Sequence, residues 1–260
     1  MARTIAVASQ KGGVGKTTTV ANLAAAWSTL GPRVLAVDFD PQFALTRAFG
    51  LAPSEAPATV VELLAGEREL GEAIARDVLP GVDLLAARRE LANLELSLVT
   101  ELKREEFLAQ ALADAARYDV VLIDCPPNLG LLTVNALFAA GEVLVPVSML
   151  DGGAFQGAGE VLATIRRLAE RGVALEVAAL VRTLVDRRRV SYQAISDALS
   201  ELDAPLAAAE IPLRADFNTA LLHGRPLAAM RPDGAGALAY RRLAEELAAT
   251  APSPRLRRAA

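Results

Sequence analysis

The sequence predicts an α/β fold, with a mostly parallel, twisted β-sheet flanked by helices on both faces. Short apolar runs of strand length alternate with helix-length amphipathic segments along most of the 260-residue chain. A glycine-rich segment, residues 10–19, lies between the first expected strand and the first expected helix. Hydrophobic residues make up 53% of the chain, which is enough for a large core.

The expected strands are short, apolar and often β-branched, as is typical of strands buried on both faces of a parallel sheet. They cover residues 4–9, 33–38, 82–86, 118–124, 142–147, 175–181 and 207–211. The clearest is 118–124, in which four consecutive apolar residues stand before Asp124. Cys125 and two prolines then end it.

The expected helices carry apolar residues at helical spacing. They cover residues 17–30, 60–76, 91–117, 130–140, 155–171, 188–202 and 235–249. Thr100 marks a break expected in the third of them. We expect residues 1–250 to form a single domain and residues 251–260, rich in proline and arginine, to be a disordered tail.

Residues 10–19 fit the phosphate-binding pattern G-x-x-x-x-G-K-[ST], except that Gln10 replaces the first glycine. Backbone N–H groups can crowd around an anion only where no Cβ blocks the approach, and Gly12, Gly13 and Gly15 meet that need. The alternative is an ordinary glycine-rich turn. We favour a phosphate site because the segment also joins a strand to a helix N-terminus.

The polar residues of this segment have the chemistry that a nucleoside triphosphate requires. Lys16 offers a positive charge to the β- and γ-phosphates, and the Thr17 hydroxyl can bind Mg²⁺. A second lysine, Lys11, precedes Lys16 by five residues and has no place in the general pattern.

Three carboxylates are expected at the carboxyl ends of strands, where open parallel sheets bind ligands. Asp124 ends a strand and is expected to hold Mg²⁺ together with Thr17 and water. Asp38 and Asp40 follow another strand with a spacing that lets both point toward the phosphates. We assign Asp38 to the metal site with Thr17 and Asp124, while one of the pair can orient the attacking water. Turn formation or helix capping is the alternative role for these aspartates.

Net charge, hydropathy and cysteine content exclude several classes of protein. The formal net charge is −4, so any nucleic-acid site must be a local basic patch. No apolar run is long enough to cross a membrane, and the first strand begins too early to leave room for a signal peptide. The single cysteine, Cys125, excludes an internal disulfide and fits a cytoplasmic location.

Arginines provide the candidate DNA site. Arg187, Arg188 and Arg189 form a cluster expected to open a helix, and Arg214 and Arg225 are expected nearby. Arginines of the tail are further candidates; they are Arg255, Arg257 and Arg258. The alternative is a solvated run of charge with no partner.

The chain resembles the ParA/MinD family of P-loop ATPases, which have a deviant Walker A motif. The resemblance rests on Lys11–Thr18, Asp38–Gln42 and Asp124–Pro127 and covers about residues 3–250. The small chromosome- and plasmid-partitioning ATPases of the ParA/Soj type are the most similar subgroup. Ile211-Pro212 and the segment 239–247 are similar to the C-terminal half of that subgroup.

The resemblance implies an ATPase that forms a sandwich dimer around ATP and Mg²⁺. Lys11 would reach the phosphates of the partner subunit, Asp40 would position the attacking water, and Asp124 would be the Walker B acid. Lys11, Lys16 and Asp40 are the implied catalytic residues. The implied nucleotide contacts are Lys11, Gly12, Gly13, Val14, Gly15, Lys16, Thr17 and Thr18, with Thr183, Leu184, Pro212 and Leu213 around the adenine.

The resemblance also implies partners. Members of this type bind double-stranded DNA non-specifically as the ATP dimer and therefore associate with the nucleoid. A ParB-like centromere-binding or adaptor protein then stimulates hydrolysis, and the ATPase leaves the DNA.

Three alternatives stay open. A MinD-like ATPase that cycles on the membrane would end in an amphipathic helix, whereas this tail has Leu256 as its one bulky apolar residue. An iron–sulfur carrier on the same fold would need more than one cysteine per subunit. A ParA-like adaptor could use ATP only to dimerise and position a cargo other than DNA. We expect no membrane partner.

Overall fold

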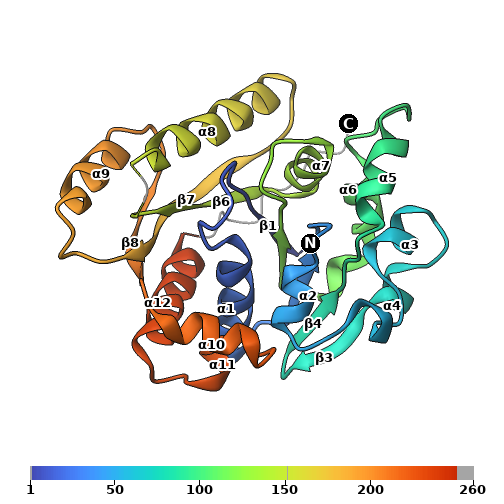
Figure 1. Cartoon of the computed structure of the whole chain (residues 1–260). Helices are drawn as coiled ribbons and strands as arrows, with labels where there is room; N and C mark the ends of the chain where they lie inside the picture. Colours follow the sequence, from blue (N-terminus) through green and yellow to red (C-terminus); the bar gives the residue numbers. More distant parts are fainter. Residues whose placement is uncertain (1, 151, 251–260) are drawn as a thin grey trace.

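A computed structural model describes residues 2–150 and 152–250 of the chain (Figure 1). Its eight-stranded sheet has the strand order β3-β4-β2-β5-β1-β6-β7-β8. All neighbouring pairs are parallel except β3 with β4. The strands are β1 (Arg3–Val7), β2 (Val34–Asp38), β3 (Ala75–Leu79), β4 (Val82–Leu85), β5 (Val120–Asp124), β6 (Glu142–Ser148), β7 (Glu176–Val185) and β8 (Leu206–Pro212). The predicted α/β fold is confirmed.

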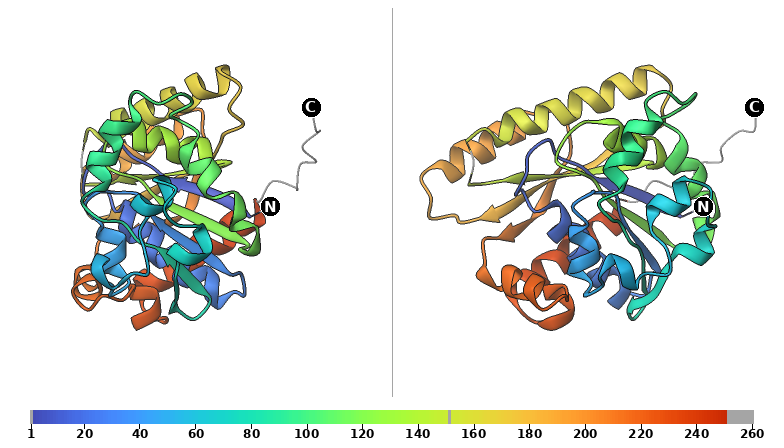
Figure 2. Two further views of the ribbon diagram at one scale, coloured as in Figure 1. Left: turned by 90° about the vertical axis from the view of Figure 1, so that its right-hand side faces the viewer. Right: turned by 45° about the vertical axis from the view of Figure 1, so that its right-hand side comes forward.

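Helices cover both faces of this sheet, as Figure 2 shows from two sides. One face packs against α1 (Lys16–Thr29), α2 (Ala44–Ala48), α11 (Leu227–Met230) and α12 (Ala235–Ala249). The other packs against α3 (Val60–Leu64), α4 (Leu70–Ala73), α5 (Leu91–Leu98), α6 (Phe107–Ala111), α7 (Leu131–Ala139), α8 (Ala154–Glu170) and α9 (Ser191–Ser200). Short 3₁₀ turns cover Pro53–Glu55 and Ala113–Arg117, and α10 (Ala215–Leu222) lies below α1 and α12 in Figure 1.

The single helix expected over residues 60–76 is wrong. The segment instead forms α3, α4 and the start of β3. Gly66 has a φ of 72°, in the left-handed region that ends helices. The apolar positions that suggested one helix are shared between two short helices and an edge strand, and β3 exists because it pairs with β4.

Other boundaries differ for local reasons. The break expected near Thr100 is real, since α5 ends at Leu98 and α6 begins at Phe107. The helix expected from residue 188 begins at Ser191, so the arginine cluster lies in the turn before α9. The short helices α2, α10 and α11 were not predicted, because each is too short for a clear helical period.

The two edge strands, β8 and β3, each have a feature that occupies or distorts their unpaired edge. On β8, the backbone N–H groups of Ala208 and Ala209 donate to the Glu246 carboxylate of α12, at 2.8 and 3.0 Å. On β3, Asp77 has a φ of 51° and the register with β4 shifts along the strand. Both features interrupt the regular backbone pattern of a free sheet edge.

Strand register brings distant acidic residues together. Asp38, the last residue of β2, is directly opposite Asp124, the last residue of β5. Val7 at the end of β1 is opposite Asp124 on the other side. The loop that follows β1 therefore emerges beside both carboxylates. Within the described part of the chain, no helix has the length and apolar character needed to span a bilayer.

Candidate functional site

The glycine-rich loop forms an anion cradle at the start of α1. Gly13 and Gly15 have φ angles of 74° and 90°, which other residues rarely adopt. Gly15 is the N-cap of α1, and no side chain caps the helix. The first backbone N–H groups of α1 therefore remain available to a ligand, and the positive end of the helix dipole adds to their attraction for phosphate.

Lys16 is buried at this cradle, with 7% of its surface exposed. Its Nζ donates to the backbone oxygen of Lys11 at 3.0 Å, across the loop. Burial lowers the pKa of the Lys16 ammonium, while Asp124 and Asp40 act in the opposite direction. A ligand phosphate would supply the negative charge that this desolvated cation lacks.

Thr17 and Asp124 come together as predicted. The Thr17 hydroxyl donates to Asp124 Oδ2 at 2.7 Å. Asp124 Oδ1 is buried and has no hydrogen-bond partner among the described residues. Burial and the neighbouring Asp38 charge raise the pKa of Asp124 well above its usual value. A hydroxyl beside a carboxylate with an unused oxygen fits the oxygen ligands that Mg²⁺ prefers.

Asp38 makes a different set of contacts. Its Oδ2 accepts hydrogen bonds from the backbone N–H and the hydroxyl of Thr46, both at 2.7 Å. Its Oδ1 accepts the N–H of Asp40 at 3.3 Å. Burial raises the pKa of Asp38 to about 6. Asp38 thus fixes the start of α2 and, like Asp124, lies outside the lining of the cavity described below. Its role as a metal ligand stays a prediction.

Asp40 does line the cavity, and 9% of its surface is exposed. Its Oδ1 accepts the backbone N–H of Gln42 at 2.9 Å, and its own backbone oxygen accepts the N–H of Phe43 at 2.8 Å. Phe43 has a φ of 44°, a conformation that is uncommon for an aromatic residue. The loop that carries Asp40 is therefore tightly turned and internally hydrogen-bonded.

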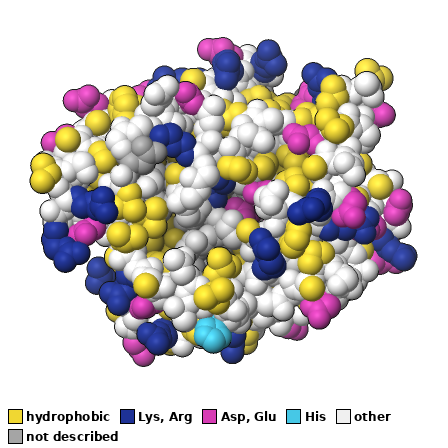
Figure 3. Space-filling view, in the orientation of Figure 1, with side chains coloured by type: hydrophobic (Ala, Val, Ile, Leu, Met, Phe, Trp, Pro, Cys, Tyr) yellow, Lys and Arg dark blue, Asp and Glu magenta, His cyan; other side chains and the backbone are white. Residues whose placement is uncertain are grey.

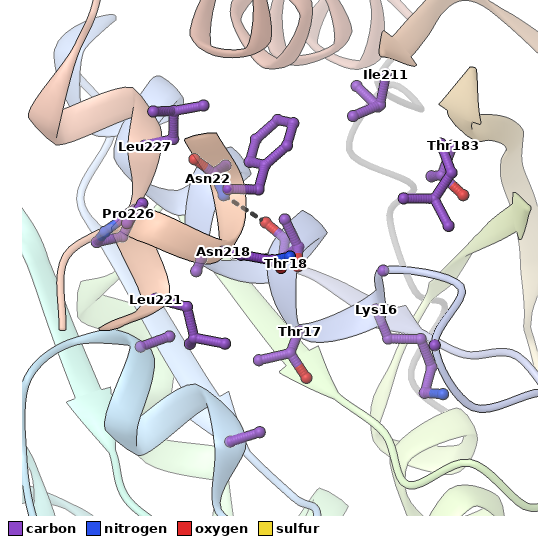
Figure 4. Close-up of a pocket in the computed structure, with 18 of the residues that line it drawn as sticks. Lys16, Thr17, Thr18, Asn22, Thr183, Ile211, Asn218, Leu221, Pro226 and Leu227 are labelled. Carbon is purple, nitrogen blue, oxygen red and sulfur yellow. Dashed lines mark hydrogen bonds between the residues drawn. The ribbon is translucent and has the colours of Figure 1, made fainter. Parts of the chain in front are cut away.

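A cavity of about 410 Å³ extends from the cradle to α10 and α11. Figure 4 shows Lys16 and Thr17 at one end and Leu221, Pro226 and Leu227 toward the other. All four residues assigned to the adenine by resemblance line it; they are Thr183, Leu184, Pro212 and Leu213. A cavity with a cation and a hydroxyl at one end and several apolar side chains toward the other suits a nucleotide.

Several residues that line the cavity were not predicted from the sequence. The additional lining residues include Asn22, Ile211, Phe217, Asn218, Leu221, Pro226 and Leu227. Most lie on or beside α10 and α11, the two short helices that were not predicted. Asn22 of α1 connects that helix to α11. Its Nδ2 donates to Thr18 O at 2.8 Å, and its Oδ1 accepts the backbone N–H of Ala228 at 2.9 Å. The turn prolines Pro212 and Pro226 were the available signal for a separate short segment.

Lys11 is outside the lining of this cavity. The stem of its side chain lies against α8, since a Cβ built on Gly157 would be 3.6 Å from Lys11 Cγ and Cδ. A Cβ built on Gly12 would meet nothing within 4 Å among the described residues, and Gly12 is not in the left-handed region. No contact within the described chain therefore requires glycine at this position.

Three of the candidate arginines, Arg187, Arg188 and Arg214, each pair with a carboxylate. Arg187 pairs with Glu210 at 2.8 Å and Arg188 with Asp186 at 2.8 Å, both at the turn before α9. Arg214 pairs with Asp216 at 3.2 Å and, like Arg225, lines the cavity. Figure 3 shows Lys and Arg side chains along the lower left edge of the molecule, on the side where Figure 1 places α9 and α10. Tail arginines lie outside the described residues.

Known proteins resemble this chain in sequence and in fold. Residues 2–177 match the family model of the AAA domain. The chain is 35% identical to the sporulation initiation inhibitor protein Soj of Bacillus subtilis over 252 residues, which cover 96% of this chain and 99% of Soj. It is 36% identical to the chromosome partitioning protein ParA of Caulobacter vibrioides over 251 residues, or 94% of this chain and 93% of ParA.

A solved structure from Mycobacterium smegmatis, named as a cobyrinic acid a,c-diamide synthase with bound ADP and magnesium, also superposes on the chain. The TM-score is 0.81 at 38% identity, with 94% of this chain and 93% of the other covered. That neighbour binds ADP and magnesium on the fold described above. The chain therefore belongs to the AAA domain family and, within it, to the ParA/Soj group of P-loop ATPases.

Proposed function

We propose that this protein hydrolyses ATP slowly with Mg²⁺, dimerises around the nucleotide and moves DNA, as a chromosome or plasmid partitioning ATPase in the cytoplasm. The observation that carries the nucleotide part is the geometry of the cradle. Lys16, the uncapped start of α1 and the Thr17–Asp124 hydrogen bond all meet at one end of the 410 Å³ cavity. The bound ADP and magnesium of the M. smegmatis neighbour support the same ligands here.

Each residue of the proposed site has its own role in phosphoryl transfer, a reaction that depends mainly on positioning and charge stabilisation. Backbone N–H groups of residues 12–17 and the Lys16 ammonium bind the phosphates, and Thr18 approaches the α-phosphate. Thr17, with Asp124 through water, would hold Mg²⁺, which neutralises charge on the phosphate oxygens. Asp40 faces the cavity and orients the attacking water. Leu184, Pro212 and Leu213 enclose the base.

Dimerisation is supported by two neighbouring residues of the loop, Lys11 and Gly12. Lys11 belongs to the cradle but its side chain lies toward α8, so it would serve the phosphates of a second subunit rather than those in its own cavity. Gly12 is next to it, and the described chain gives no internal reason for glycine there. Close approach of a partner or its nucleotide would supply that reason. Lys11 would then act as a cation supplied in trans.

DNA is the proposed cargo because of the names of the relatives and the exposed arginines. ParA of C. vibrioides is a chromosome partitioning protein. In the present chain, the Arg187 and Arg188 side chains are 72% and 90% exposed. Pairing two copies would double this weak charge, so ATP would control DNA binding. A ParB-like or adaptor protein would stimulate hydrolysis and release the DNA.

The deciding experiment measures retention of double-stranded DNA by the full chain with ATP, with ADP and without nucleotide, over a series of salt concentrations. We expect retention with ATP alone and a steep loss with salt, about a thousandfold between about 50 and 200 mM when six or more phosphates are contacted. Equal retention in all three nucleotide states would contradict nucleotide control. Retention in none, together with an ATP-driven dimer, would favour a cargo other than DNA.

Lys11→Ala tests the dimer in the same assay. We expect this variant to keep ATP binding but to lose both ATP-driven dimerisation in analytical ultracentrifugation and DNA retention. Lys103→Ala is the matched control, since Lys103 lies in the turn between α5 and α6 and its side chain is 72% exposed. A Lys11→Ala protein that still dimerises with ATP would remove the trans role of this lysine.

A further inference from the structure

A single side chain of β7, that of Thr183, is hydrogen-bonded to the phosphate loop. The Thr183 hydroxyl donates to the backbone oxygen of Val14 at 2.7 Å, a buried contact between residues 169 positions apart in the sequence. Thr183 is 1% exposed and Val14 is 4% exposed, so water cannot replace this hydrogen bond easily. Figure 4 shows Thr183 across from Lys16 at the edge of the cavity.

Thr183 is itself rigidly placed. It is paired with Ser148 of β6 in the sheet register, and its backbone oxygen accepts the N–H of Met149 at 2.9 Å. The loop it holds is intrinsically loose, because Val14 stands between Gly13 and Gly15, both with positive φ. A donor held in the sheet thus restrains a segment of the cradle in which glycines on both sides leave the backbone conformationally permissive.

A second restraint on the loop comes from a group that also meets the ligand. Lys16 Nζ donates to Lys11 O, and the same ammonium keeps further N–H donors for a phosphate. The Thr183 hydrogen bond involves no group that the phosphates need. It therefore keeps the Val14 carbonyl turned away from the anion independently of the Lys16 contact.

Resting on the proposed ATP-binding function, we propose that Thr183 is a positioning residue for the phosphate loop. It sets the direction of the Val14 peptide, and hence of the N–H groups that surround the phosphates. The following residue, Leu184, has a φ of 53° and lines the cavity wall near the base. Two consecutive residues of β7 thereby join the phosphate end of the site to its apolar wall.

The test compares Thr183→Val with Thr183→Ser in the full chain. Valine keeps the shape and suits a strand but lacks the hydroxyl, whereas serine keeps the hydroxyl. Thr164→Val is the control: Thr164 is a buried threonine of α8 whose hydroxyl donates to a backbone oxygen, that of Glu160, at 3.0 Å. Calorimetry measures binding of Mg²⁺-ATP and of inorganic tripolyphosphate, which has no base.

Thr183→Val is expected to bind both ligands roughly tenfold more weakly, and by the same factor, because a single buried hydrogen bond that positions the shared phosphate site is removed. Thr183→Ser and Thr164→Val are expected to bind within about twofold of wild type, since the hydrogen bond to Val14 remains in both. Should the valine variant not fold, Thr183→Ala removes the same hydroxyl and must show the same weakening.

Wild-type affinity in Thr183→Val would overturn this inference and leave the proposed function standing. An equal weakening in Thr183→Ser would do the same, because the effect would then come from packing and not from the hydroxyl. Loss of ATP binding with unchanged tripolyphosphate binding would also overturn it, because the effect would then lie at the base. A wild-type chain that binds neither ligand would instead overturn the proposed function.

Discussion

At the scale of single residues, the site concentrates buried acids around one buried cation. Asp38 and Asp124 are fully buried at the ends of adjacent strands, and Asp40 is nearly so. Burial raises the pKa of both Asp38 and Asp124. Without a ligand, this arrangement costs stability at neutral pH, since each charged carboxylate is poorly solvated. A divalent cation would offset part of that cost.

Asp38→Asn tests this electrostatic cost. In the folded protein the pKa of Asp38 is raised from 3.8 to about 6, so the folded state holds its proton more tightly than the unfolded state. The resulting stabilisation is complete below about pH 4 and is lost as the pH rises through about 6. The free energy of unfolding of wild type, minus that of the variant, should fall by roughly 2 kcal/mol from pH 4 to pH 7.

Urea denaturation of both proteins without nucleotide, over this pH range, measures the difference. Exposed Asp233→Asn serves as the control for removing one carboxylate. A difference that stays level, or that rises with pH, would show that folding does not raise the pKa of Asp38.

Which residues lie together at the candidate site was predictable where the signal is local. Lys16, Thr17 and the glycines lie within ten consecutive residues of one pattern. The Thr17–Asp124 contact also followed, because parallel strands end at one edge. The engagement of Asp38 by Thr46 did not follow, since it depends on α2, and α2 has only five residues. The Thr183 contact with Val14 is set by the crossing of distant segments and leaves no local pattern.

At the scale of elements, long helices and buried strands were predictable and short or edge elements were not. The helix expected at 235–249 coincides with α12. By contrast, β3 is a short edge strand with exposed Arg76 and Asp77, and its antiparallel pairing with β4 requires knowledge of the hairpin. Its apolar residues Ala75 and Leu79 could as well have continued a helix.

Packing of α12 against the cavity wall gives an element-scale prediction. A Cβ on Gly236 would come within 2.7 Å of Phe217 and 2.8 Å of Leu227, two residues that line the cavity. Gly236→Ala should therefore destabilise the protein by about 1–3 kcal/mol through overpacking and also weaken nucleotide binding. Gly159→Ala on α8 has open space and should instead stabilise by roughly 1 kcal/mol.

Thermal unfolding and nucleotide titration of the two variants distinguish these outcomes. The pair is matched, because both substitutions add one methyl group to a glycine within a helix. If Gly236→Ala were as stable as wild type, the α12 contact would be looser than its distances indicate.

At the scale of the whole molecule, the proposed DNA contact depends on a small basic turn in an acidic protein. Replacing Arg187, Arg188 and Arg189 together by alanine should lower DNA retention. The slope of log K against log salt should also become shallower, by about 0.9 for each DNA phosphate that the variant no longer neutralises. Arg241→Ala with Arg242→Ala, on α12, is the control for loss of cationic charge. An unchanged slope in the triple variant would place DNA elsewhere or exclude it.

The irregular edge strands of the sheet, β8 and β3, limit how copies of this chain can associate. Glu246 occupies N–H groups of β8, and the irregular backbone of β3 offers a poor template for another strand. Growth of a continuous intermolecular β-sheet is therefore disfavoured at both ends. Self-association that leaves the sheet unextended would use side-chain surfaces, and an open-ended fibre held together by backbone pairing is not a state this architecture encourages.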